Sequence, residues 1–127
     1  MARVLVVDDN EDIRELVARQ LRANGHKAVA VGSPSEALAI VDERGAPDVA
    51  VLDVAMPEMD GLQLLRELRA REGMSDLPAI FLSARVQEHD IQAGRDLGAI
   101  YLTKPFIASA LIGAISDLVE PKDAGTW

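Results

Sequence analysis

Short apolar runs alternate with amphipathic segments along most of the chain. Five apolar runs predict strands, at residues 4–7, 28–31, 49–52, 79–82 and 100–102. Four of these runs are almost continuously apolar, which is typical of strands that are covered on both faces of a sheet. The segments between them show the spacing of apolar residues that favours helices. This alternation predicts parallel βα units.

Five helices are predicted between and after these strands. Start and stop residues delimit the first three, with starts at Asn10, Ser33 and Asp60 and ends at Gly25, Gly45 and Gly73. The fourth covers about 86–97 and has the weakest apolar stripe, so we expect it to be the least firmly packed. The fifth, at 108–119, has a continuous apolar face and should dock tightly.

These elements predict one α/β domain over residues 1–120, followed by a polar tail at 121–127 that is a candidate linker. Right-handed crossovers and helices on both faces leave few arrangements of five parallel strands. We expect a flavodoxin-like, doubly wound five-stranded sheet in the order 2-1-3-4-5 with five helices. In such a sheet, ligands bind outside the carboxyl ends of the strands.

Polar side chains follow four of the predicted strands at this same end. They are Asp8 and Asp9, Asp53, Ser83 and Lys104. Asp8, Asp9 and the following Asn10 could simply cap the first helix, which is an alternative for that segment. Capping gives no reason for an acid, a hydroxyl and an amine to recur at corresponding strand ends. Their joint placement therefore predicts one assembled site.

The composition limits the chemistry of that site. The chain has 127 residues, a formal charge of −8 and a pI near 4.6, which argue against direct binding to nucleic acid or to an anionic membrane. The absence of Cys excludes disulfides and thiolate metal sites, and we interpret His26 and His89 as surface residues. No signal-peptide core or membrane-length run occurs in the sequence, so we expect a cytoplasmic protein.

Three acids in one pocket would repel one another strongly. Two unit charges about 4 Å apart interact by roughly 4 kcal/mol at an effective dielectric of ~20. A hard divalent cation relieves this repulsion, and few carboxylates with open positions for water and phosphate favour Mg²⁺ over Ca²⁺. One carboxylate could then attack phosphorus, while Lys104 neutralises the transferring group and Ser83 donates a hydrogen bond to it.

The motifs and their order resemble the receiver domain of two-component response regulators. The resemblance covers nearly the whole chain and consists of the acidic pair, Asp53 with Met56-Pro57 and Asp60-Gly61, Ser83-Ala84, and Tyr101 before Lys104-Pro105-Phe106. It implies that Asp53 accepts a phosphoryl group from a histidine kinase or a phosphotransfer protein. It also implies that Asp9, Asp53 and the backbone carbonyl of Ala55 bind Mg²⁺, with Asp8 acting mainly through water.

The same resemblance implies roles for the other residues. Ser83, Ala84 and Lys104 would bind the phosphoryl group, Ser83 and Tyr101 would form the switch, and Ala55 and Arg85 would tune the lifetime of the phosphorylated form. The Lys104–Pro105 peptide bond is often cis in the family. Two features depart from its commonest pattern: Ser83 stands where Thr is more frequent, and the stretch from Ser83 to Tyr101 is one residue shorter than usual.

The expected output is a changed surface formed by the fourth helix, fifth strand and fifth helix. Its partner would be a downstream protein, an output domain outside these residues, or a second copy in a phosphorylation-linked homodimer. The alternative of a haloacid dehalogenase type phosphatase lacks the second Asp two positions after Asp53, and a flavin carrier fits poorly with 3% aromatic residues. We interpret Arg66, Arg69 and Arg71 as a solvated helix face balanced by Glu67 and Glu72.

Overall fold

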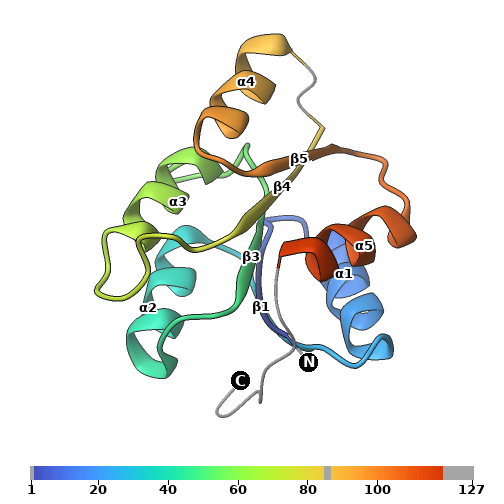
Figure 1. Cartoon of the computed structure of the whole chain (residues 1–127), viewed down its shortest axis with the longest axis horizontal. Coiled ribbons are helices and arrows are strands. Elements are labelled where there is room, and N and C mark those ends of the chain that lie inside the picture. The colour runs from blue at the N-terminus through green and yellow to red at the C-terminus, as the bar shows by residue number, and fades with distance from the viewer. Residues whose placement is uncertain (1, 85–86, 119–127) are drawn as a thin grey trace.

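The computed structural model describes residues 2–84 and 87–118, which form a parallel sheet flanked by helices (Figure 1). The strand order β2-β1-β3-β4-β5 confirms the predicted flavodoxin-like, doubly wound arrangement. Every pairing in the sheet is parallel. The strands are β1 (Arg3–Val7), β2 (Lys27–Val31), β3 (Val49–Leu52), β4 (Ala79–Ser83) and β5 (Ile100–Thr103).

Helices cover both faces of this sheet. They are α1 (Glu11–Ala23), α2 (Pro34–Arg44), α3 (Gly61–Arg69), α4 (Glu88–Asp96) and α5 (Ala108–Leu118). α1 and α5 cover one face, and α2, α3 and α4 lie on the other (Figure 1). Alternate residues of β1 enter different cores: Leu5 packs with the α2 and α3 side, whereas Val6 packs with α1 and α5. This double burial explains the continuously apolar strands.

The predicted helix caps are confirmed. The side chains of Asn10, Ser33 and Asp60 accept hydrogen bonds from backbone N–H groups in the first turns of α1, α2 and α3, respectively. Gly25 and Gly45 have positive φ angles of 86° and 87° just beyond the ends of α1 and α2. α3 ends at Arg69, before the predicted limit at Gly73, and residues 70–74 turn before the chain reaches β4.

The two C-terminal helices differ in packing as expected. α4 buries only Asp90 and Gly94, whereas α5 buries Leu111, Ala114 and Ile115. The lifetime-tuning candidate Arg85 lies outside the described residues, as do Val119, Glu120 and the tail at 121–127. Among the described residues, no helix has both the length and the apolar character needed to cross a lipid bilayer.

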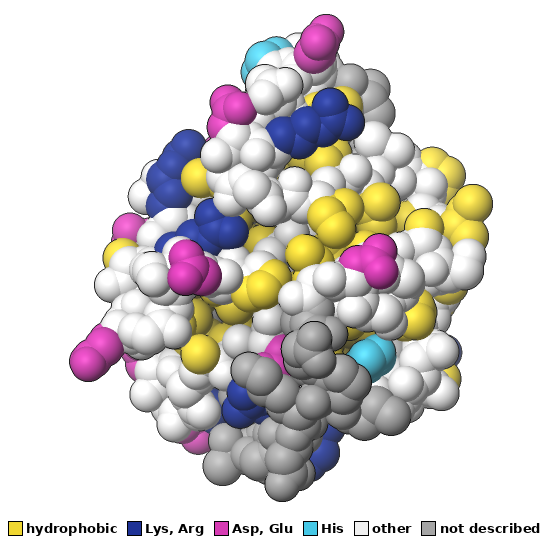
Figure 2. Space-filling model, viewed as in Figure 1, with side chains coloured by type: hydrophobic (Ala, Val, Ile, Leu, Met, Phe, Trp, Pro, Cys, Tyr) yellow, Lys and Arg dark blue, Asp and Glu magenta, His cyan; other side chains and the backbone are white. Residues whose placement is uncertain are grey.

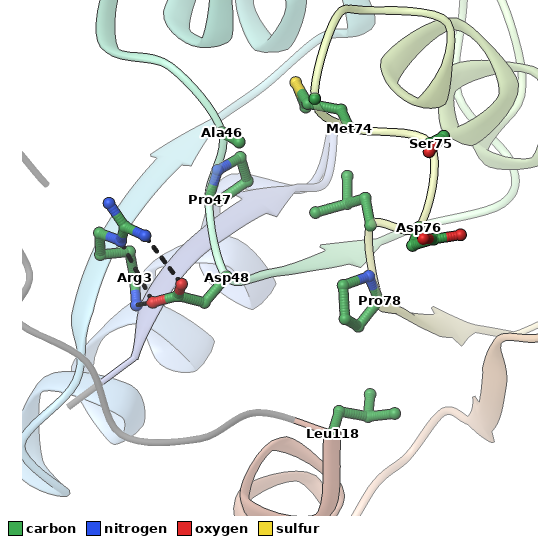
Figure 3. A pocket seen from close by; sticks show the side chains of 11 residues that line it. Arg3, Ala46, Pro47, Asp48, Met74, Ser75, Asp76, Pro78 and Leu118 are labelled. Carbon is green, nitrogen blue, oxygen red and sulfur yellow. Dashed lines mark hydrogen bonds and ion pairs between the residues drawn. The ribbon is translucent and has the colours of Figure 1, made fainter.

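A depression of about 470 Å³ lies at the N-terminal ends of β1, β3 and β4 (Figure 3). Arg3 and Asp48 form a 2.9 Å ion pair on its wall, and Asp48 also accepts a hydrogen bond from the Arg3 backbone. These bonds join the starts of β1 and β3, which are neighbours in the sheet. The predicted site lies at the opposite ends of the same strands, so this depression is separate from it.

Candidate functional site

The carboxyl ends of β1 and β3 bring three acids together. The strands pair with Val7 beside Leu52, so Asp8 and Asp53 emerge next to each other. A carboxylate oxygen from each of Asp8, Asp9 and Asp53 lies within 4.8 Å of the others. Asp8 and Asp53 are buried, whereas Asp9 is exposed. The sheet register therefore assembles an acidic pocket that is open on one side.

Lys104 enters the same pocket from the segment after β5. Its Nζ lies 2.8 Å from Oδ2 of Asp8 and 3.7 Å from Oδ1 of Asp53. The Lys104 backbone N–H donates a 2.8 Å hydrogen bond to the carbonyl of Ser83, and the peptide bond from Lys104 to Pro105 is cis. The backbone bond to Ser83 and the ion pair with Asp8 thus place the ammonium group of Lys104 beside the acids.

Further bonds orient Asp8. Its Oδ1 accepts a 2.9 Å hydrogen bond from the backbone N–H of Asn10, while its other oxygen receives Lys104. Arg14 in α1 donates to the Asp8 carbonyl at 3.3 Å. Asn10 itself caps α1 through Ile13. The capping alternative is therefore correct for Asn10, whereas Asp8 is directed into the pocket.

The environment of Asp53 makes its ionised form costly. Burial, followed by the charges of Asp8 and Asp9, raises the pKa of Asp53 to about 6 despite the opposing charge of Lys104. The side chain of Asp53 is nevertheless mostly ionised at neutral pH, since that value lies below neutrality. A desolvated carboxylate with one nearby cation has its charge only partly compensated.

The donor set fits a hard divalent cation. All three candidate ligands offer carboxylate oxygens, which suit Mg²⁺ or Ca²⁺ rather than a soft metal. The exposed Asp9 leaves one side of the cluster accessible. A cation bound there would offset the repulsion that raises the Asp53 pKa. The residues present are thus compatible with the predicted metal site.

The remaining predicted residues lie on or just after β3, β4 and β5. Ser83 is the last residue of β4 and is fully buried, and Ala84 after it is exposed. Tyr101 lies on β5 opposite Phe81, with ring centroids 6.1 Å apart. The backbone of Ala55 follows Asp53 by two positions, and Ala55 is exposed. β4 and β5 therefore place the predicted switch pair on adjacent strands.

Gly61 is a site residue whose importance the sequence prediction missed. A Cβ atom at this position would overlap the backbone carbonyl of Asp53, and the Gly61 N–H donates a 2.9 Å hydrogen bond to Val54. The first turn of α3 consequently packs directly against the Asp53 backbone. The sequence does offer one sign that Gly61 matters: a glycine stands at the first position of a helix, although glycine is a poor helix former.

Two arginines on α3 and its C-terminal turn correct the prediction of a solvated face. Arg69 donates to the carbonyls of Leu77 and Leu97, and Arg71 pairs with Asp42 of α2 at 3.0 Å. Charge spacing along one helix cannot reveal these contacts, because the partners come from other segments. Of the three arginines, Arg66 is exposed, whereas Arg69 and Arg71 are half-buried.

The two histidines also differ from each other. The Nδ1 atom of His26 accepts a 3.2 Å hydrogen bond from the backbone of Ala2, and burial lowers the His26 pKa. His26 is therefore half-buried, so the prediction of a surface residue holds only in part. His89 is exposed, as predicted, and lies 3.5 Å from Asp90 in α4. Neither histidine belongs to the acidic pocket.

Comparison with known proteins places these features in a family. The family model for the response regulator receiver domain matches residues 4–116. The response regulators MprA of Mycobacterium leprae and Mycobacterium tuberculosis are 41% and 40% identical over 126 residues, which are 96% of this chain and 54% of each relative. The chain thus spans about half the length of the curated relatives it matches.

Solved structures agree with this match. The chemotaxis protein CheY4 of Vibrio cholerae superposes with a TM-score of 0.85 at 30% identity, covering 94% of this chain and 99% of that one. The receiver domain of the Francisella response regulator 1452 gives a TM-score of 0.82 at 33% identity, covering 93% and 96% of the two chains.

Proposed function

The chain belongs to the response regulator receiver domain family, and from this premise we propose that it is a phosphoacceptor switch whose acceptor is Asp53. One observation supports this choice of residue above all. The buried Asp53 carboxylate lies within 4.8 Å of oxygens of two further acids and 3.7 Å from the ammonium group of Lys104. An oxygen nucleophile with cationic partners at hand is what phosphoryl transfer to a carboxylate requires.

We propose that Asp9, Asp53 and the backbone carbonyl of Ala55 hold Mg²⁺, and that Asp8 contributes through water. When bound, the ion supplies positive charge to phosphoryl oxygens during transfer. Lys104 supplies a second positive charge, since its Nζ already lies between Asp8 and Asp53. Asp8 keeps this ammonium group in place, because the two are joined at 2.8 Å and Asp8 is itself held by Asn10.

The transfer step uses one oxygen of Asp53. That oxygen forms a bond to phosphorus as the bond from phosphorus to the donor histidine nitrogen breaks, and the electron pair of that bond returns to the imidazole. The donor is a histidine kinase or a phosphotransfer protein. Because Asp53 is buried, water stabilises its carboxylate only weakly. Lys104 balances the negative charge that the phosphoryl group adds.

The phosphoryl group would act on the switch through Ser83, Ala84 and Lys104. Ser83 is buried at the end of β4, so donating to a new oxygen requires it to shift. Tyr101 on the adjacent strand would follow. Moving a two-state equilibrium from about 1:99 to about 99:1 takes about 5.5 kcal/mol. A few charge-assisted hydrogen bonds, at about 1.5–3 kcal/mol each, can supply this free energy. Ala55 and Arg85 would set how fast water removes the group.

The proposed output surface comprises α4, β5 and α5. Figure 2 shows hydrophobic side chains gathered between α4 and α5, where β5 forms the edge of the sheet. Ile107, between β5 and α5, is 70% exposed. Such a patch favours a protein partner. The partner would be a downstream protein, an output domain beyond these residues, or a second copy in a phosphorylation-linked homodimer.

The family membership identifies a signalling domain rather than a true enzyme. The alternative of a haloacid dehalogenase type phosphatase is not supported, since the family model that matches residues 4–116 is that of the receiver domain. The chemistry also argues against a phosphatase, because position 55 is alanine, whereas that class has its acid/base aspartate two positions after the nucleophile. Phosphate on Asp53 would therefore be a signal, removed by self-hydrolysis.

Incubation with acetyl phosphate followed by intact-mass measurement tests the proposal. The parent chain should gain one phosphoryl group in Mg²⁺ and none when a chelator replaces the metal, and Asp53→Asn should gain none. Asp60→Asn is the matched control, because Asp60 caps α3 nearby and should label like the parent. Labelling of Asp53→Asn equal to that of the parent would remove Asp53 from the acceptor role.

A further inference from the structure

Arg69 joins three segments at one edge of the sheet. Its Nε and Nη2 donate hydrogen bonds to the carbonyl of Leu77 at 3.2 and 2.9 Å, and its Nη1 donates to the carbonyl of Leu97 at 2.5 Å. Arg69 is the last residue of α3, Leu77 precedes β4, and Leu97 caps the C-terminus of α4. All three lie at the N-terminal edge of the strands, opposite the acidic pocket.

The guanidinium group suits this position for two reasons. Its planar set of donors can serve two carbonyls on separate segments, which a lysine ammonium group does less well. Its positive charge also lies at the C-terminus of α4, where the helix dipole is negative. Burial lowers the Arg69 pKa while Asp76 raises it, and an arginine in this setting stays protonated.

The two ends of α4 are held differently. Near the C-terminus Gly94 is buried, and a Cβ there would lie 3.0 Å from ring carbons of both Phe81 and Tyr101. At the N-terminus Gln87 makes no side-chain capping bond, and residues 87–89 are exposed. The C-terminal half of α4 is thus in close contact with β4 and β5, whereas the first turn is exposed at 87–89 and is buried at Asp90.

We propose that Arg69 is a positioning residue for the switch, which fixes the C-terminal end of α4 as a pivot while the N-terminal end moves on phosphorylation. This inference rests on the proposed function of Asp53. The nine residues of α4 span about 14 Å. Its first turn follows Ser83-Ala84 at the carboxyl edge of the sheet, so a shift of Ser83 acts on the end of α4 that is remote from Arg69. The contact between Gly94 and Tyr101 couples the C-terminal half of α4, which Arg69 fixes, to Tyr101.

Hydrogen exchange of the full chain, read by mass spectrometry, tests the pivot. Samples with and without acetyl phosphate and Mg²⁺ are compared, and intact mass gives the phosphorylated fraction in parallel. In the parent, phosphorylation should change exchange of the amides at 88–91 and leave those at 97–99 unchanged. An adduct with equal changes at both ends would overturn the pivot alone, whereas the absence of any adduct would overturn both the pivot and the proposed function.

Substitutions then assign the pivot to Arg69. In Arg69→Met, exchange of the Leu97 and Gly98 amides should accelerate by about tenfold or more, as expected when a charge-assisted hydrogen bond is lost. Arg69→Lys retains the charge but not the bridge and should accelerate similarly. Arg66→Met, on the exposed face of the same helix, is the control and should match the parent. Parent-like exchange in either Arg69 variant would overturn the assignment.

Tyr101 supplies a readout that would stay the same if Arg69 only stabilised the fold. It is the single tyrosine of the chain, so fluorotyrosine labelling gives one ¹⁹F signal from the protein. Per phosphorylated molecule, that signal should shift severalfold less in Arg69→Met and Arg69→Lys than in the parent or Arg66→Met. A full shift in the Arg69 variants would show that α4 needs no fixed end, and the proposal would be wrong.

Discussion

Replacing Asp53 by Asn should stabilise the metal-free chain at neutral pH. Burial, together with the charges of Asp8 and Asp9, raises the Asp53 pKa from 3.8 to about 6. A pKa unit corresponds to about 1.4 kcal/mol, so the ionised carboxylate destabilises the folded state by about 3 kcal/mol. Asparagine has a similar shape and no charge, and it relieves this cost. The magnitude is large compared with a typical surface substitution.

The sign depends on which state binds the proton more tightly. Asp53 has a raised pKa when folded, so its protonated form favours folding. Below a pH of about 4 both states are protonated, and between about 4 and 6 the unfolded chain ionises first. The parent therefore loses this contribution as the pH rises through that window. The difference in unfolding free energy between Asp53→Asn and the parent should grow from near zero to about 3 kcal/mol.

Urea unfolding in the presence of a chelator, repeated across this pH range, measures that difference. The matched control is Asp117→Asn on the exposed side of α5, which should change the free energy of unfolding by less than about 0.5 kcal/mol. A difference for Asp53→Asn that is absent, independent of pH or opposite in sign would refute the reasoning that burial and like charges destabilise its carboxylate.

Three further substitutions test neighbouring parts of the site. Lys104→Met should raise the Asp53 pKa above its value of about 6, because the cation 3.7 Å away that lowers it is lost, and an unchanged or lowered pKa in a ¹³C NMR titration would contradict this. Gly61→Ala should lower the free energy of unfolding by about 2 kcal/mol, since the new methyl group meets the Asp53 carbonyl; an unchanged urea midpoint would count against that contact. Asp60→Ala should lower it by about 1 kcal/mol through loss of the α3 cap, and an unaltered urea midpoint would exclude a capping role.

Much of the fold could be predicted from the sequence because local rules and burial agree. The apolar strands require cover on both faces, and chirality then limits the order of strands. The caps of α1, α2 and α3 follow from single residues whose side chains bond their own first turn. The convergence of Asp8, Asp53 and Lys104 follows in turn, because parallel strands end at one edge.

Other features depend on contacts that no local pattern encodes. The partners of Arg69 are carbonyls in two distant segments, and α3 alone would leave the side chain in solvent. The need for glycine at position 61 depends on how closely α3 approaches Asp53. The raised pKa of Asp53 likewise requires a known depth of burial. These properties arise from packing distances, which hydrophobic periodicity does not specify.

Chemical mapping of the phosphorylated carboxylate tests whether Asp53 is the phosphoacceptor. Borohydride reduces an acyl phosphate to an alcohol, so an aspartyl phosphate becomes homoserine, which peptide mass spectrometry locates. After incubation with acetyl phosphate and Mg²⁺, homoserine is expected at position 53, with Asp8 and Asp9 unmodified. Homoserine at either of those two positions, or at none in a chain that has gained phosphate, would contradict this expectation.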